Sequence, residues 1–269
     1  MKQESSVISQ PGVVTCQVDA RGVARIALNR PELHNAWNPE LVVALNDAVV
    51  RVSQERDVRA VVLAGEGRSF SAGGDLRWMR GILDLSSEQR RQDALRIGAL
   101  LVAVDACPKP VIARVHGAAI GGGFGLVCCS DIAIAGTQAS FGLSEVRLGI
   151  VPAMISPFVV ARLGEALARA RFLTGRDPVS AADALAFGIV HRVVEQDELD
   201  AAVEEEVGAI LRSAPGAIAE TKRLFHRAGG LSKGEMIAEA ADALVKRWET
   251  AEAREGLQAF LEKRKPAWR

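Results

Sequence analysis

Residues 116–152 read HGAAIGGGFGLVCCSDIAIAGTQASFGLSEVRLGIVP, and this stretch decides the fold prediction. An apolar run at 111–115 leads into it, and the consecutive glycines Gly121, Gly122 and Gly123 open a helix-like apolar run. A strand that feeds a glycine-rich helix start leaves backbone N–H groups free, with no side chains in the way. This pattern predicts a site for an anion or a developing oxyanion. Glu145, in a glycine-flanked turn nearby, is a candidate for moving a proton.

The segments around this stretch alternate between strand-like and helix-like patterns. Runs at 13–18 and 23–28 flank a turn and predict a hairpin. Asn38 followed by Pro39 predicts a helix start, and further strands are expected at 58–64 and 132–135. The pattern after about residue 160 is almost purely helical. We therefore expect an α/β fold, with a core over residues 1–200 and a helical region over 201–269.

Composition and charge exclude several classes of partner. The 33 Lys and Arg residues equal the 33 Asp and Glu residues, so no general attraction to nucleic acid or to an anionic membrane is expected. No apolar run approaches the length of a membrane span, and the polar N-terminus MKQESSVISQPG lacks the apolar core of a signal peptide. The four cysteines show neither metal-ligand nor disulfide spacing. We expect a cytoplasmic protein with no metal site.

A second glycine loop occupies residues 72–75, Ala-Gly-Gly-Asp, and also follows an apolar strand. Two such loops can each aim one N–H at a common point and form an oxyanion hole. Losing one donor of such a pair typically costs about 2.7–4 kcal/mol of transition-state stabilisation. The alternative is that both loops are ordinary strand-to-helix turns, because short glycine motifs arise often by chance.

Taken together, the motifs resemble the enoyl-CoA hydratase/isomerase (crotonase) superfamily over nearly the whole chain. The matching segments are Asn29-Arg30-Pro31, Asn35-Ala36, 70–76, 117–123, Asp131-Ile132, 141–149, Thr174-Gly175, 184–190 and 256–265. The resemblance implies a spiral of ββα units followed by a helical trimerisation region. It also implies an acyl-CoA thioester substrate, no separate cofactor, and assembly as a homotrimer or a dimer of trimers.

The resemblance also assigns site residues one by one. The two oxyanion-binding N–H groups of the family fall on Gly74 and Gly122. The positions that contact CoA in the family fall on Leu33, His34, Ala36, Ala72, Asp75, Leu76, Phe260 and Lys263. For Lys263, the alternative is a solvated helix charge.

The chain keeps one of the two glutamates that typical hydratases of this family use. The first glutamate position is Gly125 here, and the second matches Glu145. Glu145 alone would then serve as base and acid, a role worth roughly 10²–10⁴ in rate. The alternative for Glu145 is a helix first-turn carboxylate beside an N-cap at Ser144, favoured by the helix dipole.

The glycine at 125 together with Glu145 is similar to the glutaconyl-CoA hydratase branch of the family. That branch includes methylglutaconyl-CoA hydratases of leucine breakdown and isohexenylglutaconyl-CoA hydratases of terpene breakdown. Such substrates carry a distal carboxylate, for which Arg77 and Arg80, spaced to share a helix face, are candidate contacts. Surface solvation is the alternative role for both arginines.

Three other functions compete with a hydratase. A double-bond isomerase or decarboxylase of the same fold would use Glu145 without adding water. A catalytically silent acyl-CoA binder is compatible with the missing glutamate. An RNA-binding role, known for a branch with a lysine-rich first helix, is disfavoured because residues 40–56 contain no lysine.

Overall fold

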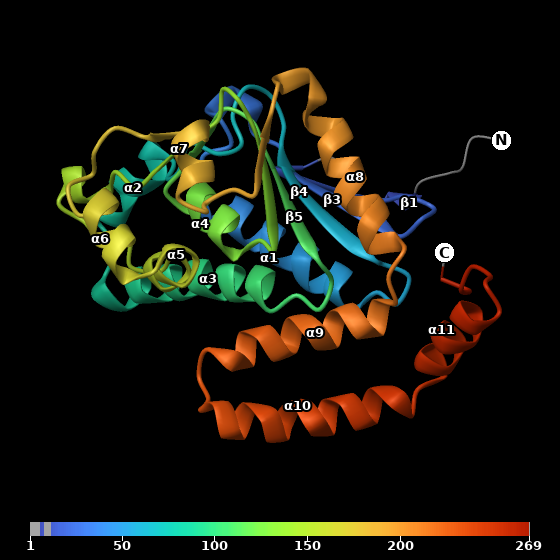
Figure 1. Ribbon diagram of the computed structural model, residues 1–269. Helices are drawn as coiled ribbons and strands as arrows, with labels where there is room; N and C mark the ends of the chain where they lie inside the picture. Colours follow the sequence, from blue (N-terminus) through green and yellow to red (C-terminus); the bar gives the residue numbers. More distant parts are fainter. Residues whose placement is uncertain (1–5, 8–11, 269) are drawn as a thin grey trace.

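The computed structural model describes residues 6–7 and 12–268, and a seven-stranded sheet lies at its centre (Figure 1). The strand order is β1-β2-β3-β4-β5-β7-β10; the pairs from β3 onward are parallel, and the others are antiparallel. A smaller sheet has the order β6-β8-β9. The strands are β1 (Ser6–Val7), β2 (Val14–Val18), β3 (Val23–Leu28), β4 (Ala60–Gly65), β5 (Val111–Val115), β6 (Ala118–Ile120), β7 (Ile132–Gly136), β8 (Ser140–Gly142), β9 (Val179–Ser180) and β10 (Arg192–Val194).

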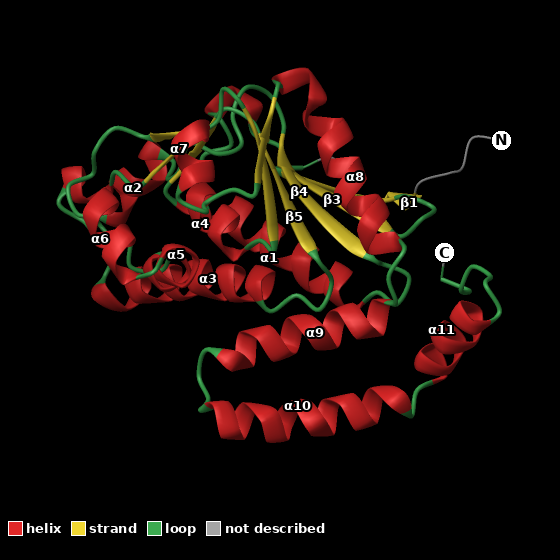
Figure 2. Cartoon of the chain, viewed as in Figure 1, coloured by secondary structure: helices red, strands yellow, loops and turns green. Residues whose placement is uncertain are grey.

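Helices cover both faces of the large sheet and continue beyond it (Figure 2). The α-helices are α1 (Pro39–Gln54), α2 (Leu76–Ile82), α3 (Ser87–Asp105), α4 (Gly122–Cys129), α5 (Ser156–Leu163), α6 (Glu165–Phe172), α7 (Ala181–Ala186), α8 (Leu199–Leu211), α9 (Pro215–Ala228), α10 (Lys233–Trp248) and α11 (Ala251–Leu261). Three 3₁₀ turns are η1 (Pro31–Leu33), η2 (Glu145–Leu148) and η3 (Gln196–Glu198). The Asn38 side chain accepts a hydrogen bond from Leu41 N at 2.8 Å, so the predicted start of α1 is confirmed.

Alternate residues of the strands feed two separate apolar cores. On one face, Val62, Ile112 and Ile134 pack with the buried side of α8. On the other face, Val61 and Leu63 join a larger core with residues of α1, α3, α4 and α5. Because the sheet is covered on both faces, its parallel strands are mostly apolar, as expected for an α/β fold. The exceptions are Arg25 in β3, Arg114 in β5 and Arg192 in β10.

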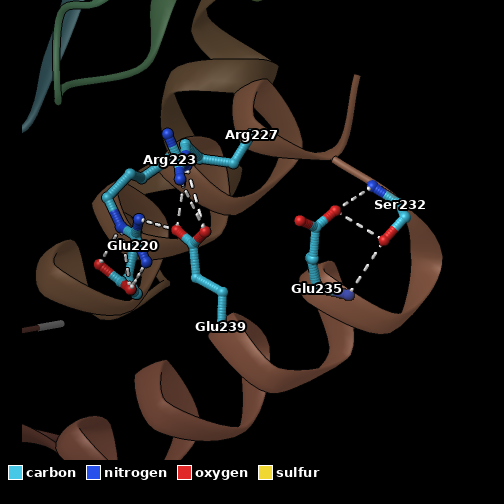
Figure 3. Close-up of polar contacts among 6 residues, drawn as sticks. All are labelled: Glu220, Arg223, Arg227, Ser232, Glu235 and Glu239. Atoms are coloured by element: carbon cyan, nitrogen blue, oxygen red, sulfur yellow. Dashed lines mark hydrogen bonds and ion pairs between the residues drawn. The ribbon is translucent and has the colours of Figure 1, made fainter. Parts of the chain in front are cut away.

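The C-terminal helices α9, α10 and α11 extend away from the sheet (Figure 1). Glu239 on α10 accepts hydrogen bonds from Arg223 and Arg227 on α9 and holds the two helices together (Figure 3). Ser232 and Glu235 form a capping box at the start of α10. The boundary expected at residue 200 falls inside α8, which packs on the sheet, so the extended part of the chain begins at α9.

The main strands and helices lie where the sequence predicted them, including the hairpin of β2 and β3 and the start of α4 at the glycine run. The strands β1, β6, β8, β9 and β10 were not predicted from the sequence, because strands of two or three residues carry no measurable periodicity. The expectation that the N-terminus lacks the apolar core of a signal peptide rests on residues 1–12, most of which lie outside the described residues. Within the described part of the chain, no helix is long and apolar enough to cross a membrane.

Candidate active site

The two glycine loops lie side by side because a parallel β-bridge joins Ser71, just before one loop, to Ala119, just before the other. A second contact ties Trp37 to the loop at 72–75. Trp37 N donates to Gly73 O at 2.7 Å, and Asp75 N donates to Trp37 O at 2.8 Å. This pattern is that of a parallel β-bridge between Trp37 and Gly74. Its two hydrogen bonds use the backbone on either side of Gly74, and within the described residues the Gly74 N–H has no hydrogen-bond partner.

The second free donor belongs to the start of α4. Gly122 is the first residue of α4, a position whose N–H has no acceptor inside the helix. Its neighbour Gly121 donates to Gly142 O at 2.9 Å, which ties the helix start to β8. The Gly122 N–H therefore projects from a fixed helix end, where the partial positive charge of the helix favours an anion.

Glycine is required at these positions because the backbones approach very closely. Gly73 and Gly121 have φ angles of +92° and +53°, which residues with a Cβ adopt only with strain. A Cβ on Gly121 would lie 3.4 Å from Gly73 Cα. A Cβ on Gly122 would lie 2.7 Å from the Trp37 ring, and one on Gly123 would lie 2.6 Å from Ser71 Cβ. The two loops therefore pack directly on each other, as the sequence analysis required for converging donors.

Glu145 reaches the same place from η2. Its Oε1 would lie 3.1 Å from a Cβ on Gly121, and its Oε2 is buried without a hydrogen-bond partner. Burial raises the pKa of the Glu145 carboxyl, and this outweighs the lowering by the backbone N–H groups of Ser144 and Glu145. The alternative role for Glu145 was a first-turn carboxylate beside an N-cap at Ser144. Ser144 makes no side-chain capping bond to η2, so the N-cap of that alternative is absent.

A pocket of about 250 Å³ joins these groups. Among its lining residues, Glu145 is the one with an ionisable side chain, and most of the others are apolar. The lining residues are Trp37, Gly74, Trp78, Met79, Ile82, Ala94, Ile97, Gly122, Glu145, Ile150, Val151, Pro152, Ala153, Met154 and Ile155. Three larger hollows lie away from these residues: one at α9, one among α9, α10 and α11, and one between α8 and the strands β2 and β3.

A buried polar network holds the segment 30–36 against the segment that carries the 72–75 loop. Asn35 accepts from Arg30 N at 2.9 Å and donates to Glu66 O and Ser69 O at 2.8 and 2.7 Å. Arg30 forms an ion pair with Asp75 at 2.9 Å, and both side chains are about nine-tenths buried. Asp75 also caps the start of α2. This network fixes the backbone on both sides of Gly74.

Six of the eight predicted CoA-contacting residues come together on the neighbouring segments 33–36 and 72–76. Ala72 N donates to His34 O at 2.9 Å, and Ala36 O accepts from the Arg30 side chain. Leu33, His34, Ala72 and Leu76 are exposed, whereas Ala36 and Asp75 are buried. Phe260 and Lys263 are at the end of α11, on the far side of the molecule from α2 and α4 (Figure 1). Both are exposed and do not reach the pocket of their own chain.

Arg77 and Arg80 are exposed on α2 and do not line the pocket. Gly125 is buried in α4, and a Cβ there would lie 3.2 Å from Ile155 and 3.3 Å from Leu101. Apolar side chains therefore occupy the space beside Gly125.

Arg162 on α5 satisfies the opposite end of α4. Its guanidinium donates to the carbonyls of Cys128 at 3.1 Å, of Val127 at 3.4 Å and of Ser130. All three residues are buried, and carbonyls at the C-terminus of a helix lack acceptor bonds within the helix. The Val127 carbonyl also accepts from Ser130 N at 3.3 Å. A cation at this end also complements the helix dipole. Arg162 thus helps to fix the helix that carries Gly122.

Trp37, Trp78, Asn35 and Arg162 were not predicted from the sequence as site-supporting residues. Trp78 had a usable signal, because it follows the 72–75 loop by three residues in a chain with only 4% aromatic residues. Trp37 is far from both glycine loops in the sequence and had no such signal. Among the described residues, no group of three or more His, Cys, Asp or Glu side chains is arranged to hold a metal ion.

Comparison with known proteins agrees with this geometry. Residues 19–269 match the family model "Enoyl-CoA hydratase/isomerase". A putative enoyl-CoA hydratase of Thermus thermophilus is 36% identical, covering 93% of this chain and 98% of the relative. A crotonyl-CoA hydratase of Syntrophomonas wolfei is 34% identical, covering 90% and 93%. The crystal structure of an enoyl-CoA hydratase from Shewanella pealeana superposes with a TM-score of 0.92 at 36% identity, covering 96% and 97%.

The chain therefore belongs to the enoyl-CoA hydratase/isomerase (crotonase) family. The mixed α/β fold is that of its structural neighbours. The relatives' names support one enzyme class, the hydratases, which are carbon–oxygen lyases.

Placing a glutamate at position 125 is expected to destabilise the protein without adding activity. Gly125→Glu crowds Ile155 and Leu101 and buries a second carboxyl, which should cost about 3 kcal/mol or more in urea unfolding. Gly125→Ala, the control for crowding alone, should stay within about 1 kcal/mol because alanine favours the helix. A Gly125→Glu protein that is as stable as wild type and hydrates faster would contradict this account.

Arg162→Met is expected to lower the free energy of unfolding by about 2 kcal/mol, because buried carbonyls of α4 lose their donor. Arg162→Lys should recover part of the loss. Arg169→Met on α6, which removes only a surface pair with Glu165, is the matched control and should change little. Urea unfolding measures all three, and equal stability of Arg162→Met and Arg169→Met would contradict the role of Arg162.

Proposed function

We propose that this chain is an enoyl-CoA hydratase that adds water reversibly to a 2-enoyl-CoA thioester. One observation carries the proposal: two unpartnered backbone N–H groups, of Gly74 and Gly122, and the buried carboxyl of Glu145 line one pocket. An anion-stabilising pair beside a single proton carrier suits chemistry in which a thioester becomes an enolate.

In this mechanism the N–H groups of Gly74 and Gly122 donate to the thioester oxygen. They are fixed by the Trp37 bridge and by α4, so they need no rearrangement as negative charge grows on that oxygen. Ionised Glu145 takes a proton from water as the water adds to the β-carbon. The same carboxyl then delivers a proton to the α-carbon, and the reverse sequence removes water.

The finer substrate proposal is a β-branched glutaconyl-CoA thioester. It rests on the sequence pattern of Gly125 with Glu145, and on the apolar side chains packed around Gly125, which leave Glu145 as the single carboxylate of the pocket. Because Arg77 and Arg80 lie outside the pocket lining, other groups must contact a distal carboxylate once it is inside.

We also propose that the enzyme assembles as a homotrimer or a dimer of trimers. The helices α9, α10 and α11 expose large apolar side chains, such as Phe225, Trp248 and Leu261, with 60–75% of their surface accessible. Since Phe260 and Lys263 do not reach the pocket of their own chain, a CoA-binding role for them requires a neighbouring copy. The soluble, cytoplasmic setting predicted from the sequence is part of the same proposal.

Glu145→Gln is expected to lower kcat for hydration by roughly 10²–10⁴, because the amide cannot carry the proton. Binding of a saturated acyl-CoA should change little, since the backbone donors and the apolar wall remain. Glu165→Gln, which changes an exposed glutamate on α6, is the matched control. Mass analysis of the product from wild type should show the gain of one water; unchanged mass with a shifted double bond would indicate an isomerase, and no turnover would indicate a silent binder.

The raised pKa of Glu145 gives a signed prediction for stability. Between the ordinary carboxyl pKa and the raised pKa in the folded protein, the folded state holds more protons than the unfolded state. Wild-type stability contributed by this group therefore falls as the pH rises through that window. Glu145→Gln should be more stable than wild type at neutral pH, and the difference should vanish as the pH falls below the window. Urea unfolding from pH 4 to pH 8 measures the difference; a constant gap would contradict the raised pKa.

A further inference from the structure

Three unpartnered buried polar atoms belong to residues that line the one pocket: Trp37 Nε1, Trp78 Nε1 and Glu145 Oε2. Across the described residues, the only other buried side-chain polar atoms without partners belong to Arg59, Arg171 and Gln196, none of which lines this pocket. Half of these atoms therefore belong to residues that line a single small cavity. The mechanism above uses Glu145 and leaves the two indole N–H groups without a role.

A buried indole N–H normally has a hydrogen-bond acceptor, because leaving the donor unpaired costs free energy. When two such donors belong to the walls of a ligand pocket, the simplest source of the acceptor is the ligand. Both N–H groups are shielded from water. Met79 and Met154 belong to the same walls, and their unbranched side chains can adapt when a ligand enters.

The two indoles flank the two free backbone donors. Trp37 Cε2, to which Nε1 is bonded, would lie 2.8 Å from a Cβ on Gly122. Trp78 is in the first turn of α2, which begins directly after Gly74 and Asp75. Both residues are thus close to the end of the pocket where the thioester oxygen would bind, so an acceptor that reaches them belongs to the acyl group.

The chemistry of the indole limits which chemical groups can be the acceptor. An indole N–H only donates, so its partner must accept. A carboxylate or carbonyl oxygen suits two such donors, because it brings no proton of its own that would need a partner. No Lys, Arg or His side chain lines the pocket, so N–H dipoles rather than a cation would hold this oxygen.

We propose that Trp37 and Trp78 bind a second oxygen of the acyl group, in a carboxylate or a carbonyl distinct from the thioester. They would thereby select acyl-CoA substrates that carry such a second group. This inference rests on the proposed hydratase function and deepens it, since it names the groups that would meet a distal carboxylate. Trp37 and Trp78 are then specificity-determining residues of the site.

The kinetic test compares two substrates of matched shape, 3-methylglutaconyl-CoA with a terminal carboxylate and 3-methylcrotonyl-CoA without one. Trp78→Phe and Trp37→Phe keep an aromatic ring and remove the N–H. Each should lower the ratio of kcat/KM for the first substrate over the second by at least 10-fold. Trp268→Phe, which removes an indole N–H that donates to Arg212 O outside the pocket, is the matched control and should leave the ratio unchanged. The ω-methyl ester of the first substrate tests whether a neutral carbonyl serves as well as a carboxylate.

An equal loss for both substrates, or no loss, would overturn the proposal, because the N–H groups would then act on the fold or on a step common to both. A wild type that hydrates neither substrate would instead refute the proposed function. The second test below needs no turnover and separates these two failures.

The binding test follows the indole N–H resonances by NMR. The chain has four tryptophans, and each Trp→Phe variant assigns one resonance. Glutaryl-CoA or its ω-methyl ester should shift the Trp37 and Trp78 resonances well beyond the shift caused by valeryl-CoA, which has the same chain length and no acceptor. Equal shifts with all three thioesters would overturn the proposal, even if Trp37→Phe proved too unstable for kinetics.

Discussion

The direct packing of two backbones, at Gly73 and at Gly121, is the constraint on which the candidate site depends. Because neither position carries a Cβ, two loops that are almost fifty residues apart in the chain come within van der Waals contact. The β-bridge to Trp37 then fixes the position of the Gly74 backbone, and the start of α4 fixes the position of the Gly122 backbone. Donor geometry in this protein is thus a property of backbone contact, with side chains serving to hold the backbones in place.

Support for this contact comes from both polar and apolar parts of the fold. The Asn35, Arg30 and Asp75 network fixes one loop, and Arg162 fixes the far end of α4. Around them, the side chains of 150–155 line the pocket beside Glu145. Burial of Glu145 raises its pKa. A site of this kind combines rigid dipoles with a low dielectric, the condition in which such dipoles act most strongly on charge.

Local signals in the sequence were sufficient for elements that depend on local chemistry. The Asn38–Pro39 start of α1 and the glycine start of α4 follow from capping and backbone freedom, and the structure confirms both. Contacts between distant segments were beyond reach, because no periodicity encodes the pairing of Trp37 with Gly74. For the same reason the sequence could place Arg77 and Arg80 on one helix but could not show that they lie outside the pocket. The short strands β6 and β9 form only because tertiary pairing holds them.

The close fit around Gly125 has a consequence for how this site can evolve. The side chains of Ile155 and Leu101 already contact the space beside Gly125. A mutation that introduces a carboxylate at position 125 therefore requires an earlier mutation to a smaller residue at 155 or 101. Each of those changes alone would open a cavity and cost stability without any gain in chemistry. The order in which these mutations can occur is therefore constrained. Epistasis among positions 101, 125 and 155 keeps a protein with this packing at one active-site carboxylate.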